Sequence, residues 1–282
     1  MQITFWGVRG SIPTPGVGTE LVGGNTSCVE VQAGPTRLIF DGGTGLRLLG
    51  KKLLGQLPIT AHMFFSHVHW DHIQGFPFFE PAFVAGNVFH LYGARKLSRT
   101  LEETLAGQMD HPNFPVHLSA MGAKMAFRNL AEGEAVDIDG GKEGEPARVT
   151  SVSGNHPQGV LAYRVECGGK SAVYATDTEH HEGKVDENLV RIAEGADVLI
   201  YDSQYMPEEY DGTAGGLSSK RGWGHSTYEE GARIARIAGV SRLVLFHHDP
   251  GHDDAFVRQK ELRAQALFPD TVAAREGLTL NF

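Results

Sequence analysis

Short apolar runs and alternating apolar and polar residues divide this chain into segments typical of strands, and several of them are separated by stretches of helical periodicity. We predict strands near residues 2–6, 28–33, 36–41, 60–66, 147–154, 159–166, 170–176, 196–202 and 242–247. Apolar spacings of three and four predict helices near 45–54, 96–108, 185–194, 227–238 and 253–267. Residues 226–229 (Ser-Thr-Tyr-Glu) have the spacing of a capping box at one helix start. Alternating strands and helices indicate an α/β fold.

Length and composition agree with one compact domain over residues 1–282. The chain is 41% hydrophobic and shows no linker, repeat or low-complexity tract. It has no apolar run of about eighteen residues, and it opens directly into a strand, so we expect no membrane span, no leader and a cytoplasmic location. Cys28 and Cys167 lack the spacing of a disulfide framework, and we expect them to pack as small hydrophobes.

The densest chemical signal lies in residues 66–72, which read Ser-His-Val-His-Trp-Asp-His directly after a predicted strand. Alternate residues leaving a strand project the same way, so His67 and His69 can bind one ion. The turn that follows lets Asp71 and His72 face a second ion. Neither ion is complete with these side chains, and further ligands must come from downstream.

Three downstream candidates each lie where a predicted strand gives way to a loop: His156, Asp177 and His247. Histidine with carboxylate ligands suits zinc, manganese or iron better than calcium. A lone histidine at a strand end is more often structural, but the clustered motif with three partners favours metal binding. Of the adjacent His247 and His248, we predict that His247 is the ligand, because it continues the alternation of Leu243 and Leu245.

The order His-x-His-x-Asp-His, His, Asp, His resembles that of the metallo-β-lactamase superfamily over nearly the whole chain. Three more stretches are similar to its tRNase Z and cyclic-phosphodiesterase branch: the opening residues 3–13 with 24–27, Asp41 in Phe-Asp-Gly-Gly, and His225 in Gly-His-Ser-Thr. The resemblance implies an αββα sandwich, with two mixed sheets inside and helices outside. It also implies that Asp41 braces the metal loop and that His225 is a proton donor.

The resemblance further implies two divalent metal ions, most simply zinc, with manganese or iron as alternatives. One ion would take His67, His69 and His156, the other Asp71, His72 and His247, with Asp177 bridging them. We expect a metal-activated hydroxide to attack phosphorus in line, and we take Asp71, His225 and Asp202 as catalytic residues. His225 would protonate the leaving group, and Asp202 either orients it or makes a structural hydrogen bond.

Charge and spacing bear on the substrate. The net charge of −9 argues against a broad nucleic-acid surface. Two divalent ions with Asp71, Asp177 and one hydroxide would nevertheless leave the site at about +1, which suits a phosphodiester anion. The interval from His156 to Asp177 is too short for the tRNA-gripping arm of tRNase Z, and bulky Trp70 narrows the space beside the metals. We therefore expect a small anionic, plausibly cyclic, phosphodiester as the substrate.

The sequence is compatible with several alternatives. Precursor tRNA is the second candidate substrate, because a homodimer could form a basic groove, and a thioesterase or lactamase activity fits the metal ligands alone. Aromatic residues between 73 and 125 could wall a pocket or form a satellite core. The segment 205–223, with Lys220, Arg221 and Trp223, is either a substrate lid or a surface loop. Arg9 could meet a phosphate or be solvated, and Asn25 and Ser27 could hold a turn or touch substrate.

Overall fold

Two seven-stranded sheets form the centre of the molecule. The computed structural model describes residues 1–95, 99–140, 144–215 and 218–282. The first sheet has the order β14-β1-β2-β3-β4-β5-β6, and the second has the order β13-β12-β11-β10-β9-β8-β7. The strands span Gln2–Gly7 (β1), Cys28–Ala33 (β2), Thr36–Phe40 (β3), Thr60–Phe64 (β4), Val88–Ala94 (β5), Lys124–Leu130 (β6), Ala135–Ile138 (β7), Ala147–Gly154 (β8), Val160–Cys167 (β9), Lys170–Ala175 (β10), Val198–Asp202 (β11), Arg242–Phe246 (β12), Thr271–Ala273 (β13) and Thr279–Asn281 (β14).

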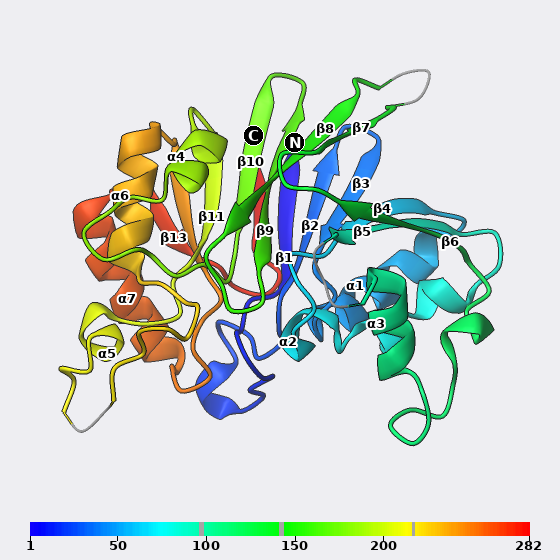
Figure 1. The fold of residues 1–282 in the computed structure, drawn as a ribbon, viewed down its shortest axis with the longest axis horizontal. Coiled ribbons are helices and arrows are strands. Elements are labelled where there is room, and N and C mark those ends of the chain that lie inside the picture. Colours follow the sequence, from blue (N-terminus) through cyan, green and yellow to red (C-terminus); the bar gives the residue numbers. More distant parts are fainter. Residues whose placement is uncertain (96–98, 141–143, 216–217) are drawn as a thin grey trace.

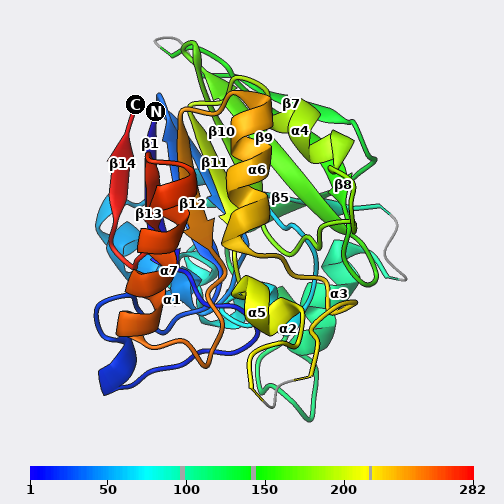
Figure 2. The same ribbon diagram turned by 90° about the vertical axis from the view of Figure 1, so that its left-hand side faces the viewer.

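Helices cover the outer faces of both sheets, as Figures 1 and 2 show. The α-helices span Gly45–Leu53 (α1), Trp70–Ile73 (α2), Leu101–Gln108 (α3), Glu187–Ala193 (α4), Pro207–Tyr210 (α5), Tyr228–Ala238 (α6) and Asp254–Leu267 (α7). One hydrophobic cluster fills the space between the sheets, a second lies under α4, α6 and α7, and a third under α1 and α3. The expected αββα sandwich is therefore confirmed.

Parallel strands in each half bring the loops of interest together. The strands β3, β4, β5 and β6 are parallel neighbours in the first sheet, and so are β10, β11, β12 and β13 in the second. The carboxyl ends of parallel strands meet at one edge, which is where loops can combine side chains from distant parts of the sequence. No helix among the described residues is long and apolar enough to cross a membrane.

All nine strands predicted from the sequence are present, and β5, β6, β7, β13 and β14 were missed. Strand β6 alternates only weakly in burial, and β13 and β14 have three residues each. None of these three strands therefore gives a clear period-two signal in the sequence. The helix expected over 96–108 begins at Leu101, and residues 96–98 lie outside the described residues. Phe76 and Phe79 are buried in the third cluster, which makes the 73–125 aromatics largely a satellite core.

The expected capping box at α6 is wrong. Thr227 is the N-cap residue and makes no side-chain capping bond. The Ser226 hydroxyl instead lies 2.9 Å from His180 Nδ1 and 3.1 Å from the Tyr201 hydroxyl. Its partners come from other parts of the fold, so the local spacing of Ser226 and Glu229 could not reveal them.

Candidate metal centre

Strained backbone marks the place where the strand ends converge. Among the described residues, the non-glycine residues with positive φ are Ser11, Asp41, Gln158, Asp177 and His247, with φ between 51° and 69°. Such conformations cost of the order of 1–3 kcal/mol each and persist where the surrounding structure holds them. Each of these residues either belongs to the candidate ligand groups below or hydrogen-bonds to a member of them.

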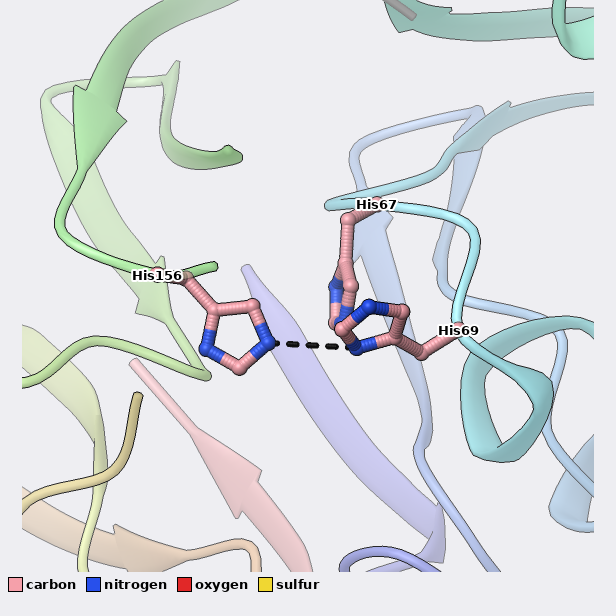
Figure 3. A group of neighbouring side chains, drawn as sticks. All are labelled: His67, His69 and His156. Atoms are coloured by element: carbon pink, nitrogen blue, oxygen red, sulfur yellow. Dashed lines mark hydrogen bonds between the residues drawn. The ribbon is translucent and has the colours of Figure 1, made fainter. Parts of the chain in front are cut away.

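The first ligand group, here called the histidine group, consists of His67, His69 and His156, whose ligand atoms all lie within 4.8 Å of one another. Figure 3 shows His67 and His69 on the loop after β4, facing His156 from the β8–β9 loop. His69 Nδ1 lies 3.2 Å from His156 Nε2. His67 Nε2 is buried and has no hydrogen-bond partner.

The outward ring nitrogens of the histidine group all have partners of their own. His67 Nδ1 lies 3.1 Å from the Ser66 hydroxyl, and His69 Nε2 lies 3.1 Å from Gln158 Oε1. His156 Nδ1 lies 2.8 Å from the Gly224 carbonyl oxygen. When one imidazole nitrogen donates outward, the other is left as a lone-pair ligand, which is the usual arrangement around protein-bound metals.

The second group, the carboxylate group, consists of Asp71, His72, Asp177 and His247, all buried. Asp71 Oδ2 lies 3.2 Å from both His72 Nε2 and His247 Nε2. Asp177 Oδ1 lies 3.2 Å from His72 Nε2 and 3.3 Å from His247 Nε2. Asp177 Oδ2 points the other way, 3.7 Å from His67 Nε2 and 4.0 Å from His156 Nε2. One carboxylate thus lies between the two groups.

The carboxylate group is held by buried hydrogen bonds. Asp41 Oδ2 lies 2.8 Å from His72 Nδ1, and the same carboxylate accepts from the Ser66 backbone N–H at 2.7 Å. Gln204 Oε1 lies 2.9 Å from His247 Nδ1. The backbone N–H of Ser11 donates to Asp71 Oδ2 at 2.8 Å. Asp41 therefore braces residues 66–72, as expected.

The donor sets fit divalent ions. Ligands at roughly 2.0–2.1 Å from a tetrahedral zinc are separated from one another by roughly 3.3 Å. The separations of 3.2 to 3.3 Å in the carboxylate group match this value. His72 Nε2, like His67 Nε2, is buried without a hydrogen-bond partner. A buried polar atom without a partner is costly, and one cation bound at each group would satisfy both nitrogens.

Electrostatics also favour a cation here. Burial lowers the pKa of His67, and the neighbouring His72 lowers it further, so His67 stays neutral and able to bind a metal. Burial opposes a charge on His72 as well, but Asp177, Asp71 and Asp41 outweigh it and raise the pKa of that imidazole. The carboxylates thus create a field that stabilises positive charge at the centre of their group.

His225 lies at the edge of the centre, beside Asp202. Its Nδ1 is 2.9 Å from Asp202 Oδ2 and 3.8 Å from Asp177 Oδ2. Burial alone would lower the pKa of His225, but Asp202, with Asp177 and Asp71 behind it, raises that pKa to about 9. With Nδ1 bonded to Asp202, Nε2 is the nitrogen left to donate to a substrate.

Glu179 is a residue of this site that the sequence did not suggest. Its carboxylate accepts from the Gly222 N–H at 2.7 Å, the Gly224 N–H at 2.8 Å and the Tyr210 hydroxyl at 2.7 Å. It thereby holds the segment just before His225. A Cβ on Gly224 would lie 2.2 Å from His156 Nδ1, so only glycine allows this close approach. Gln158 and Gln204 were missed as well, because nothing in their local sequence signals a histidine partner.

Several expectations need correction. Arg9 is neither solvated nor aimed at a phosphate: it is fully buried and donates to the carbonyl oxygens of Gly23, Asp249 and His252. His247 lies in the centre and His248 Nε2 lies 3.0 Å from the Ala274 carbonyl oxygen, yet strand alternation is not the reason. Strand β12 ends at Phe246, and the left-handed backbone of His247 then turns its side chain.

The remaining loop residues have protein partners. Arg221 pairs with Asp211 and Glu182, and Lys220 Nζ lies 4.1 Å from the ring centroid of Trp223. Part of the 205–223 segment is the short helix α5, and residues 216–217 lie outside the described residues. Asn25 hydrogen-bonds to Glu276, which favours its turn-holding role. Ser27 is fully buried.

Comparisons with known proteins agree with this fold. The beta-lactamase superfamily domain matches residues 36–248. A ribonuclease Z from Synechococcus sp. (strain CC9311) is 27% identical over 340 aligned positions, which cover 100% of this chain and 98% of that protein. Zn²⁺-bound PqqB from Methylobacterium extorquens superposes with a TM-score of 0.73 at 18% identity, covering 100% of both chains. A diphosphatase of the PhnP family superposes with a TM-score of 0.68 at 18% identity, covering 100% of this chain and 97% of that one. At this identity, the two structures show likeness of fold alone.

Proposed function

Because the chain belongs to the metallo-β-lactamase superfamily of hydrolases, we propose that it is a phosphodiesterase that uses two divalent metal ions. The proposal rests above all on Asp177, whose two carboxylate oxygens face the two ligand groups. Zinc is the ion that the histidine-rich donor set suits best, with manganese and iron as alternatives.

The residues of the chain have separate tasks in this reaction. Bound ions would supply Lewis acidity and make a water molecule nucleophilic at neutral pH. Asp177 and Asp71 contribute the negative charge that holds cations in place, while His225 donates a proton from Nε2 to the departing alkoxide oxygen. Asp202 keeps the His225 ring oriented through Nδ1 and stabilises its charged form. A raised pKa keeps this donor protonated through neutral pH.

The donor His225 separates this proposal from a thioesterase function. A thiolate leaves readily without a proton, whereas an alkoxide leaving a phosphodiester needs one. The buried pair of His225 and Asp202, at the edge of the carboxylate group, supplies such a proton. We therefore favour phosphodiester cleavage over hydrolysis of a thioester.

We propose a small or cyclic phosphodiester as the first candidate substrate. The interval from His156 to Asp177 is filled by β9 and β10, which leaves no room for an inserted arm. The alignment with the Synechococcus protein spans 340 positions, so at least 58 of its residues face none of the 282 residues here. The net charge of −9 also disfavours a long RNA footprint.

RNA 3′ processing is the second candidate, and the relatives favour it. The Synechococcus relative and a relative from Natronomonas pharaonis both carry the name ribonuclease Z. These names weigh against the sequence-based exclusion of tRNA. Precursor tRNA therefore belongs in any test of activity.

The test compares substrates on protein loaded with zinc or manganese, after elemental analysis has measured the metal content. We expect two ions per chain and a higher kcat/KM for bis-p-nitrophenyl phosphate and cyclic nucleotides than for precursor tRNA at physiological salt. Efficient cleavage of precursor tRNA at its 3′ end would replace the first substrate class by the second. A chain that binds no transition metal after reconstitution would refute the proposed function as a whole.

A further inference from the structure

A small apolar cavity lies next to the histidine group. It is lined mainly by Ala94, Leu130, Ala131, Val160 and Leu161, with Gln158 at its edge, and its volume is about 130 Å³. Leu130, Val160 and Leu161 are almost fully buried. The proposed phosphodiester cleavage uses none of the residues that line this cavity. The lining comes from both halves of the sandwich.

The fold ties the cavity to the metal centre. Ala94 ends β5, which pairs with β4, the strand that leads into His67. Val160 and Leu161 open β9, directly after the loop that carries His156. The backbone N–H of Leu161 also donates to the Ser66 carbonyl oxygen at 2.9 Å. The cavity and the metal centre therefore open from the same edge of the sandwich.

Gln158 contacts both the histidine group and the cavity. Its side-chain oxygen lies 3.1 Å from His69 Nε2, and the same residue lines the cavity. Its φ of 69° is a conformation that a non-glycine residue adopts at a cost, and the adjacent Gly159 also has a positive φ. The strained turn thus places Gln158 between the candidate ligand His69 and the apolar wall.

Size and polarity define what the cavity can hold. An apolar cavity of roughly 150 Å³ in another protein accommodates one benzene molecule, so a cavity of about 130 Å³ suits a single six-membered ring. Arg95 and Glu132 stand among the lining residues and can meet polar atoms on the edge of such a ring. A methyl group would leave most of the apolar wall without a partner.

We propose that this cavity is a subsite for one ring of the substrate, on the ester group that stays with the phosphate. The inference rests on the proposed phosphodiesterase function and narrows its substrate class to ring-bearing phosphodiesters. Pyrimidine nucleotides and phenyl esters carry such a ring. Gln158 and the buried Leu130, Val160 and Leu161 then determine specificity without taking part in the chemistry.

The experiment keeps the leaving group constant and varies the other ester. Methyl, phenyl and naphthyl p-nitrophenyl phosphates all release nitrophenolate, so differences in kcat/KM report binding of the remaining group. We expect the phenyl ester to exceed the methyl ester by roughly 10-fold to 100-fold, as burial of one ring allows. The naphthyl ester should gain nothing further, because the cavity holds one ring.

Ala131→Leu, which fills the cavity, should bring the ratio of phenyl to methyl kcat/KM toward one. Ala266→Leu, on the exposed side of α7, is the matched control and should keep the wild-type ratio. Equal kcat/KM for methyl and phenyl esters in the wild-type protein would overturn the subsite, and so would a naphthyl ester that is much better than the phenyl ester.

Failure of the proposed function is distinguishable from failure of the subsite. If metal-loaded wild-type protein hydrolyses none of the esters, the phosphodiesterase function fails. Calorimetric binding of phenyl phosphate and methyl phosphate then decides the subsite alone. Tighter binding of phenyl phosphate that Ala131→Leu abolishes supports the cavity as a ring site, and equal binding of the two phosphates refutes it.

Discussion

The histidine group and the carboxylate group lie side by side but differ in chemistry and in burial. The histidine group has three imidazole ligands, and His69 is only half-buried. The carboxylate group has two carboxylates, is buried throughout and has the further carboxylate of Asp41 behind His72. Anionic ligands in a low-dielectric surrounding attract a cation more strongly than neutral ligands near water. We therefore expect the carboxylate group to bind the tighter ion and the histidine group the more exchangeable one.

The two halves of the sandwich contribute to the site in different ways. The first half supplies His67 and His69 from the loop after β4 and Asp71 and His72 from the adjoining helix α2, and the second half supplies single residues from separate strand ends. Asp177 is where the two contributions meet, because its oxygens face both groups. A substitution of Asp177 should therefore affect both groups, whereas a substitution of another ligand should affect one group.

Asp177→Asn should have the largest effect. It removes the one negative charge that both groups share, and we expect kcat/KM to fall by roughly 10⁴-fold or more, as for a central catalytic group. Metal content should fall below two ions per chain in elemental analysis. Asp137→Asn, in an exposed ion pair with Arg148, is the control and should change neither quantity. Full activity of Asp177→Asn would remove the basis for treating the two groups as one centre.

Replacement of His247 should affect the carboxylate group alone. His247→Ala removes a buried ligand atom from that group, and we expect metal content to fall from two ions to one. His248→Ala should keep two ions, because its ring lies against the Ala274 carbonyl oxygen. The reverse pattern, with metal lost only from His248→Ala, would mean that the end of β12 has been assigned wrongly.

His225→Ala should leave both groups loaded while it slows turnover. We expect a loss of roughly 10² to 10⁴-fold, the usual contribution of a positioned general acid. The loss should be smaller for nitrophenyl esters, whose leaving group needs little protonation. His117→Ala, at a mostly exposed histidine, is the control. Equal losses for good and poor leaving groups would show that His225 does not act as the proton donor.

Local apolar patterns were enough to predict nine of the strands, and the family resemblance implied the sandwich and the residues that converge on the centre. The strands before His67, Asp177 and His247 have clear apolar runs, and the spacing of residues 66–72 is specific enough to predict a cluster. The short edge strands β13 and β14 gave no such signal because three residues contain less than two periods of alternation.

What the sequence could not provide are contacts made across the fold. Arg9 reads as a loop arginine, yet the packing of distant carbonyl oxygens around it makes it a buried donor. Gln204 and Gln158 read as ordinary polar residues, and only the tertiary structure places each beside a histidine. Glu179 likewise gains its role from Gly222 and Gly224 far along the chain.

The two glutamines provide the finest test of the difference between the groups. Gln204 is almost fully buried beside His247. Its removal therefore leaves His247 Nδ1 without a hydrogen-bond partner, and bulk water cannot easily take its place. We expect Gln204→Ala to weaken zinc binding at the carboxylate group by roughly 10 to 100-fold, measured by competition with a chelator. Gln158 is exposed, and water can take its place at His69 Nε2, so Gln158→Ala should weaken the histidine group by less. If both variants lost the same affinity, burial would not explain why the two groups differ, and the chemistry of their ligands alone would have to account for it.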